Sequence, residues 1–218
     1  GSGRVPAAFN NLVGLKPTRG WLSTSGVVPA CRSLDCVSVF ALTVDDARRV
    51  LDVAGRFDAG DEYSRPAPGS EPGFDAGSFR FGVPRDDQLE FFGNEEGRQL
   101  FYQSAEKLED LGGTRHEIDF EPFLESARLL YEGPWVSERY VAIESFIEEK
   151  GDSVFPVTRE IIAGGAHPSA ADAFRSQYRL AALKRKTDPV WDEVDFILTP
   201  TAACCYTIEE VETKPVQL

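Results

Sequence analysis

The sequence has 218 residues, of which 42% are apolar and 27% are charged, a composition typical of a soluble globular protein with a core. Its formal net charge is −13, which argues against nucleic-acid binding and against docking on anionic lipid, because both need a basic face. No apolar run reaches the length of a membrane span, and no basic stretch leads into an apolar one at the start. We therefore expect neither membrane insertion nor a signal peptide.

The first part of the chain predicts one clear helix between turn-rich segments. Residues 1–35 are rich in Gly, Ser, Pro and Thr, which favours turns, a short helix and extended pieces. From Thr43 to Ala54 the apolar residues recur with helical periodicity, with Thr43 as a suitable N-cap and Gly55 as a stop. Residues 56–78 carry many Gly, Pro, Asp and Ser and predict a surface loop.

A strand, a helix and a second strand are predicted next. Apolar residues alternate in the strand that ends at Pro84, and a helix over 95–111 ends at two glycines before a strand over 114–120. This order predicts a βαβ unit with parallel strands and a right-handed crossover.

The rest of the chain is predicted to be mainly helical. A Gly-Pro pair separates the first two of these helices, because proline suits the first turn of a new helix. The fold class is therefore α/β, with a mixed β-sheet core flanked by α-helices. We expect helices at about 123–131, 135–150, 156–163 and 170–190, and a short buried strand at 196–198.

Cysteine and histidine are the residues that would ligate a soft metal. None of the cysteines forms a C-x-x-C pair, and both histidines lie far from them in the sequence, so we predict no metal site. We interpret the cysteines as buried free thiols of a cytoplasmic protein. The cysteines are Cys31, Cys36, Cys204 and Cys205, and the histidines are His116 and His167.

The opening segment places Ser2 between two glycines. Glycines beside a serine allow close approach of a substrate and leave backbone N–H groups free to hold an oxyanion. Gly-Ser-Gly is also a common linker, so these three residues alone do not define a site.

The longer string resembles the amidase signature family. Gly-Ser-Gly-Arg-Val-Pro-Ala-Ala-Phe leads into Gly-Leu-Lys-Pro-Thr at 14–18, and the match extends through 33–35 and 44–47. The resemblance implies a partial amidase-signature fold. Residues 1–218 would then be part of a single amidase-signature domain that lacks its N-terminal segment and its C-terminal core strands.

The resemblance also implies a Ser–Ser–Lys catalytic triad with Ser2 as the nucleophile. A serine hydroxyl is a poor nucleophile until a neighbour takes its proton. A second serine, on a cis peptide bond, would relay that proton to a lysine held in its neutral form. The backbone amides of Gly1 and Ser2 would belong to the oxyanion hole, and neither a metal nor an organic cofactor is needed.

In the family, the lysine and the second serine precede the nucleophile, whereas this sequence starts at Gly1. Lys16 is not a substitute, because the Lys-Pro-Thr segment is structural in the family. We therefore expect Ser2 to be the only triad member within these 218 residues, and the chain to be a fragment of a longer enzyme.

Several local strings resemble the allophanate hydrolases within that family. Gly3 follows the serine where most amidases have a β-branched residue, and the strings at 9–11 and 31–36 also fit. In allophanate hydrolases, a tyrosine and an arginine with the spacing of Tyr131 and Arg139 bind the substrate carboxylate. Arginine suits this task because its planar fork meets a carboxylate through two parallel hydrogen bonds.

Helix patterning alone leaves an alternative open at these two positions. Tyr131 would be a core residue, and Arg139 would face solvent and pair with Glu132 or Glu138.

The function that the resemblance implies is hydrolysis of allophanate, a small urea-derived carboxylate, through an acyl intermediate on Ser2. The parent protein would be a cytoplasmic homodimer, functionally linked to a urea carboxylase, with no nucleic-acid or membrane partner. Two alternatives remain open. One is an amidase-signature enzyme that acts on a neutral amide, and the other is a non-catalytic fragment of such an enzyme.

Overall fold

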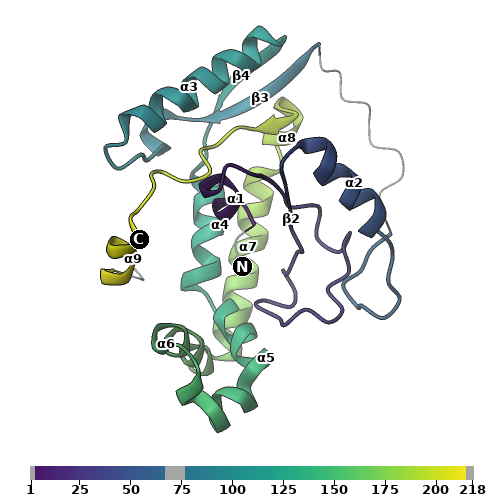
Figure 1. Cartoon of the computed structure of the whole chain (residues 1–218), viewed down its shortest axis with the longest axis vertical. Helices are drawn as coiled ribbons and strands as arrows, with labels where there is room; N and C mark the ends of the chain where they lie inside the picture. The colour runs from purple at the N-terminus through teal and green to yellow at the C-terminus, as the bar shows by residue number, and fades with distance from the viewer. Residues whose placement is uncertain (1–2, 67–76, 215–218) are drawn as a thin grey trace. The chain divides into compact units, whose positions relative to one another are not determined.

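The computed structural model describes residues 3–66 and 77–214 (Figure 1). They form two compact units. The first unit contains 3–66 together with Trp135–His167, and the second contains 77–134 together with 168–214. The chain therefore leaves the second unit at Pro134, completes the first, and returns at Pro168.

The N-terminal part of the first unit is a helix packed on a two-stranded antiparallel sheet. Its core consists of Leu22, Val39, Ala47 and Leu51, with apolar residues of both strands around them. The sequence predicts extended pieces here but not the second strand, because three residues are too few to show alternation. The elements are α1 (Val5–Phe9), β1 (Val13–Leu15), β2 (Val39–Ala41) and α2 (Val44–Ala54).

The helix α2 forms between the two capping residues that the sequence predicted for it. The Thr43 hydroxyl accepts a hydrogen bond from the backbone N–H of Asp46 at 3.1 Å, which satisfies one of the free donors of the first turn. Gly55 ends the helix. Ala47 and Leu51 are buried, and they provide the face that packs on the sheet.

The second part of the first unit is helical. The predicted helices over 135–150 and 156–163 are confirmed, although the first contains a kink at Ile143, where φ is −134°. Gly165 lies against this helix so closely that a Cβ atom there would come within 2.4 Å of the Val136 carbonyl oxygen. The elements are α5 (Trp135–Lys150), η2 (Gly151–Ser153), α6 (Pro156–Ala163) and η3 (Gly164–Ala166).

The second unit is built on a parallel three-stranded sheet in the order β4-β3-β5, with α3 packed on it (Figure 1). The predicted parallel βαβ unit is confirmed, and Gly112 ends its helix with φ of +98°. The core gathers Phe79, Phe81 and Val83 of the central strand with Phe101 of the helix. The elements are β3 (Phe79–Pro84), η1 (Asp86–Gln88), α3 (Glu95–Asp110), β4 (Gly113–Ile118) and β5 (Phe196–Ile197).

Two long helices of the second unit, α4 (Glu121–Glu132) and α7 (Ala170–Thr187), lie side by side (Figure 1). The prediction of one helix over 170–190 is wrong at its end. The chain turns at Asp188 and Pro189 before a short helix, α8 (Val190–Glu193). Pro189 lacks the N–H that an uninterrupted helix would need there, and its ring clashes with the preceding turn.

The C-terminal part shows two further differences from the sequence prediction. The strand β5 forms at the predicted place, but it is half-buried rather than buried, because it has only β3 as a partner among the described strands. The helix α9 (Ile208–Thr213) was not predicted. Its signal was present, because Thr207 and Glu210 form a capping box.

The predicted α/β class is confirmed: helices flank a sheet of parallel strands, and the antiparallel pair forms a separate sheet. Among the described residues, no helix has both the length and the apolar character that crossing a membrane requires. That the 218 residues form part of a single domain stays a prediction.

Phe81 is fully buried at the centre of the second unit, so we expect Phe81→Ala to lower the free energy of unfolding by about 3–5 kcal/mol. Phe57→Ala is the matched control, because its ring is 58% exposed and its loss should cost less than about 1 kcal/mol. Chemical denaturation measures both. Equal losses for the two variants would contradict this assignment of the core.

Candidate functional site

The predicted nucleophile Ser2 and its neighbour Gly1 lie outside the described residues, so their roles stay predictions. The described chain starts at Gly3 in a tightly packed junction. A Cβ atom at Gly3 would lie 2.2 Å from the Ser38 hydroxyl oxygen and 2.7 Å from its Cβ. A Cβ atom at Gly14 would lie 2.6 Å from the Gly3 carbonyl oxygen. Glycine at position 3 is therefore required by the serine that packs against it.

Lys16 is bound to the backbone of its own segment. Its side chain is exposed, and its ammonium group donates to the Pro17 carbonyl oxygen at 3.0 Å. These contacts agree with a structural role for Lys16.

Arg139 lies in the second turn of α5 and is half-buried. Its Nε is buried and has no hydrogen-bond partner among the described residues. Within that part of the chain Arg139 also forms no ion pair with a carboxylate, and the side chain with which it interacts is Cys31. A buried guanidinium nitrogen without a partner is costly.

Glu138, which the alternative interpretation pairs with Arg139, is occupied elsewhere. Its two carboxylate oxygens accept hydrogen bonds from Ser33, one from the backbone N–H and one from the hydroxyl at 2.8 Å. Sequence reasoning missed this contact, because it joins segments 105 positions apart and has no local signal.

The segment 30–35, which we call the support loop, is fixed by its own hydrogen bonds. Asp35 accepts from the backbone N–H groups of Ala30 at 2.9 Å and Cys31 at 3.1 Å. The guanidinium group of Arg19 donates to the Ser33 carbonyl oxygen. The loop therefore has a defined shape where it meets α5.

Cys31 is the residue of the support loop that lies beside Arg139. It is buried, and its thiol donates to the Trp135 carbonyl oxygen at 3.4 Å. Burial raises the pKa of this thiol, an effect that the nearby Arg139 guanidinium opposes. The thiol is therefore protonated at neutral pH and does not neutralise the charge of Arg139.

Tyr131 is at the end of α4 and is 75% exposed, so the core role of the alternative interpretation does not fit it. It belongs to the second unit, whereas Arg139 belongs to the first. The structure describes each residue within its own unit, and their joint contact with a carboxylate stays a prediction.

The structure places the four cysteines and the two histidines in different surroundings. All four cysteines are free, but only Cys31 is buried, so the prediction of buried thiols is wrong for Cys205, which is exposed. His116 lies on β4, paired with Gly82, and His167 is exposed after η3. Within the described ranges, no group of three or more His, Cys, Asp and Glu residues is placed to hold a metal ion.

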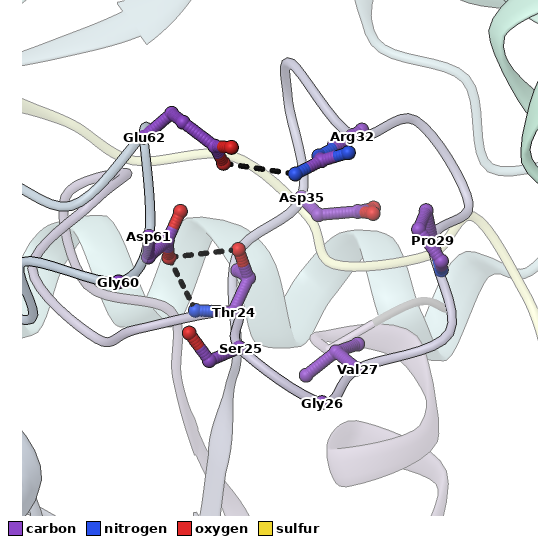
Figure 2. A pocket seen from close by; sticks show the side chains of 10 residues that line it. All are labelled: Thr24, Ser25, Gly26, Val27, Pro29, Arg32, Asp35, Gly60, Asp61 and Glu62. Carbon is purple, nitrogen blue, oxygen red and sulfur yellow. Dashed lines mark hydrogen bonds and ion pairs between the residues drawn. The ribbon is translucent and has the colours of Figure 1, made fainter.

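The first unit contains a cavity of about 360 Å³ beside the support loop (Figure 2). Its charged side chains already have partners. Arg32 pairs with Glu62 at 2.8 Å, and one Asp61 oxygen accepts from the Thr24 N–H at 2.6 Å and from the Thr24 hydroxyl at 2.9 Å (Figure 2). Other lining residues include Ser25, Gly26, Val27, Pro29 and Asp35.

The carboxylate that accepts from the serine hydroxyls near this cavity is a weak base. The hydroxyls of Ser23 and Ser25 both donate to Asp58, at 2.6 and 2.8 Å. Hydrogen bonds from Ser23, from the Gly60 backbone and from Ser25 lower the pKa of Asp58. A carboxylate with a lowered pKa accepts a proton poorly at neutral pH. This cavity is therefore not a candidate hydrolytic centre.

A family model described as Amidase matches residues 1–215. Together with the parallel sheet flanked by helices, this match shows that the chain belongs to the amidase family, as its opening motif predicts.

Two similar proteins carry names that are more specific than the name of the family. Urea amidolyase of Saccharomyces cerevisiae is 42% identical over 219 residues, covering 99% of this chain and 12% of that protein. A Kluyveromyces lactis allophanate hydrolase with one serine replaced by alanine matches in structure with a TM-score of 0.94 and 40% identity, over 99% of this chain and 35% of that one.

The name of a more distant relative indicates another class of substrate for that protein. A glutamyl-tRNA(Gln) amidotransferase subunit of Natronomonas pharaonis is 29% identical over 231 residues, covering 92% of this chain and 54% of that protein. The chain thus spans about half, a third or less of the length of these relatives.

The contact between Gly3 and Ser38 predicts a pair of compensating substitutions. We expect Gly3→Ala to cost about 1–3 kcal/mol of folding free energy, because the added methyl group overpacks the junction. Adding Ser38→Gly should restore most of this loss, because it removes both atoms that the methyl group would meet.

Thermal unfolding measures these variants. Gly164→Ala is the control, because a Cβ atom there meets nothing within 4 Å. A Gly3→Ala protein as stable as the wild type would contradict the tight junction.

Asp61 predicts a pH-dependent contribution to stability. Hydrogen bonds from the Thr24 and Tyr63 backbones lower the pKa of Asp61 from its usual 3.8. Because the folded pKa lies below the unfolded one, the contribution is present above about pH 4 and is lost as the pH falls through the folded value.

The measurement compares thermal midpoints of the wild type and Asp61→Asn at constant ionic strength. We expect the gap between them to be widest near pH 7 and to narrow below pH 4. A gap that stays constant between pH 3 and pH 7 would show that the charge of Asp61 does not contribute.

Proposed function

We propose that the parent protein hydrolyses allophanate, with Ser2 as the nucleophile and Arg139 as a residue that binds the substrate carboxylate. The observation that carries the proposal is the state of Arg139. It has a buried Nε without a partner among the described residues, while the adjacent Glu138 is bonded to Ser33. The names of the Saccharomyces and Kluyveromyces relatives support the choice of substrate.

The proposed chemistry is acyl transfer. The Ser2 hydroxyl oxygen attacks the amide carbon, and its proton passes to the leaving nitrogen through the second serine and the lysine that the family resemblance places before Gly1. The backbone N–H groups of Gly1 and Ser2 stabilise the oxyanion. After the C–N bond breaks, water attacks the acyl group and frees Ser2. The family chemistry uses neither a metal nor an organic cofactor.

Substrate selectivity in this proposal comes from Arg139 and Tyr131. The guanidinium fork of Arg139 forms two parallel hydrogen bonds with the carboxylate, and the Tyr131 hydroxyl donates a third. A neutral amide offers no charged partner to the half-buried guanidinium group, which lowers its affinity relative to the carboxylate substrate. Selectivity in this proposal therefore depends on whether the substrate carries a carboxylate.

The wider setting follows from the same resemblance. The parent protein would be a cytoplasmic homodimer that works with a urea carboxylase. The name urea amidolyase, carried by a relative that is 42% identical, favours a place in urea degradation. The net charge of −13 agrees with a small-molecule substrate rather than a nucleic acid.

A second candidate function is hydrolysis of a neutral or amino-acid amide. The similarity to a component of an amidotransferase favours it. It predicts that an arginine without a carboxylate partner has no consequence for substrate choice, so one variant separates the two candidates. A non-catalytic fragment, the remaining alternative, predicts no dependence of turnover on Ser2.

The test uses Arg139→Ala and Ser2→Ala in the full-length protein. We expect Arg139→Ala to reduce kcat/KM for allophanate by about 100-fold or more, as expected for truncating one partner of a buried charge pair, and to change turnover of propionamide by less than about 3-fold. Ser2→Ala should abolish hydrolysis of both substrates. Arg139→Lys, which keeps the charge and loses the fork, should fall between the wild type and Arg139→Ala.

Two results would contradict the proposal. One is an equal loss of allophanate and propionamide turnover in Arg139→Ala. The other is full activity in Ser2→Ala. Steady-state release of ammonia is the readout for every variant.

A further inference from the structure

The first turn of α5 is bound to the support loop at two points. The Cys31 thiol donates to the Trp135 carbonyl oxygen at 3.4 Å, and Ser33 donates twice to Glu138. These contacts lie within the first unit and involve the turn of α5 that directly precedes Arg139.

The Ser33–Glu138 contact is stronger than an ordinary surface hydrogen bond. Both oxygens of an ionised carboxylate are used, and hydrogen bonds to an ionised acceptor are roughly twice as strong as neutral ones. Both side chains are half-buried, which reduces competition from water. Because the support loop is itself fixed by Asp35, the contact transmits a fixed geometry to α5.

The position of the support loop determines which groups surround the Arg139 side chain. The support loop places Cys31 beside the guanidinium group, whose Nε is buried. If the loop moved away from α5, water would reach the guanidinium group, and its attraction for a carboxylate would fall. Adjacent residues on a helix do not face each other, so Glu138 acts on Arg139 through the loop.

We propose that Ser33 and Glu138 are positioning residues that hold the support loop against α5 and thereby present Arg139 to the substrate carboxylate. This inference rests on the proposed role of Arg139. It assigns to both residues an effect on carboxylate binding that exceeds any effect on the chemical step.

The experiment uses the full-length protein and two independent readouts. The first is the separate measurement of KM and kcat for allophanate and for propionamide. The second is binding of malonate, a small dicarboxylate that undergoes no reaction, by isothermal titration calorimetry. The variants are Glu138→Ala, Ser33→Ala and the conservative Ser33→Thr. Ser25→Ala is the matched control, because it also removes a serine-to-carboxylate hydrogen bond in the first unit.

We expect Glu138→Ala to weaken malonate binding and to raise KM for allophanate by about 10-fold or more, the loss expected for hydrogen bonds to a charged group. Ser33→Ala keeps the backbone N–H, so its loss should be smaller, about 3- to 10-fold. Values of kcat, and turnover of propionamide, should change by less than about 3-fold. Ser33→Thr should retain binding, and Ser25→Ala should match the wild type.

The two proposals fail in different ways. If the wild type does not hydrolyse allophanate, the proposed function is wrong, and malonate binding still decides the positioning role. Malonate binding that is equal in the wild type and both Ala variants, or absent in the wild type, overturns the inference. So does an equal loss of allophanate and propionamide turnover. If Glu138→Ala does not fold, as judged by circular dichroism, Ser33→Ala decides the matter.

Discussion

The two hydrogen bonds from Ser33 to Glu138 join parts of the chain that are 105 positions apart. The first unit consists of two separate segments, and this contact, with the Cys31 thiol beside it, links the loop of one segment to the helix of the other. The link also brings Cys31 of the first segment beside Arg139 of the second. A single polar contact therefore connects the architecture of the unit to the candidate site.

The helices and strands followed from the sequence where local signals were strong. The helix α2 has its Thr43 cap, α6 starts at Pro156, and the alternation in β3 predicted a buried strand. The prediction of helices and strands was wrong at a proline inside a predicted helix and missed one very short strand. Pro189 divided a predicted helix, and the three residues of β2 gave no periodic pattern.

The candidate site was less accessible to sequence reasoning than the fold. Arg139 and Tyr131 came from a family resemblance, since periodicity alone gave an ordinary surface arginine and a core tyrosine. The burial of the Arg139 Nε, and the use of Glu138 by Ser33, are tertiary facts. No local pattern predicts a contact between residues half a chain apart, because a hydrogen bond between two side chains depends on how the fold brings their segments together. The same reason explains why Ser38 was not predicted as the residue that requires Gly3.

The division of the first unit into two segments also affects the order of events during translation. The support loop leaves the ribosome well before α5, and synthesis of the intervening 105 positions takes roughly 5–20 s at typical rates of elongation. Glu138 has not been synthesised during that interval, in which the second unit's β3, α3 and β4 emerge. The contact that joins the two segments of the first unit can therefore form only after two of the three described strands of the second unit's sheet have been made.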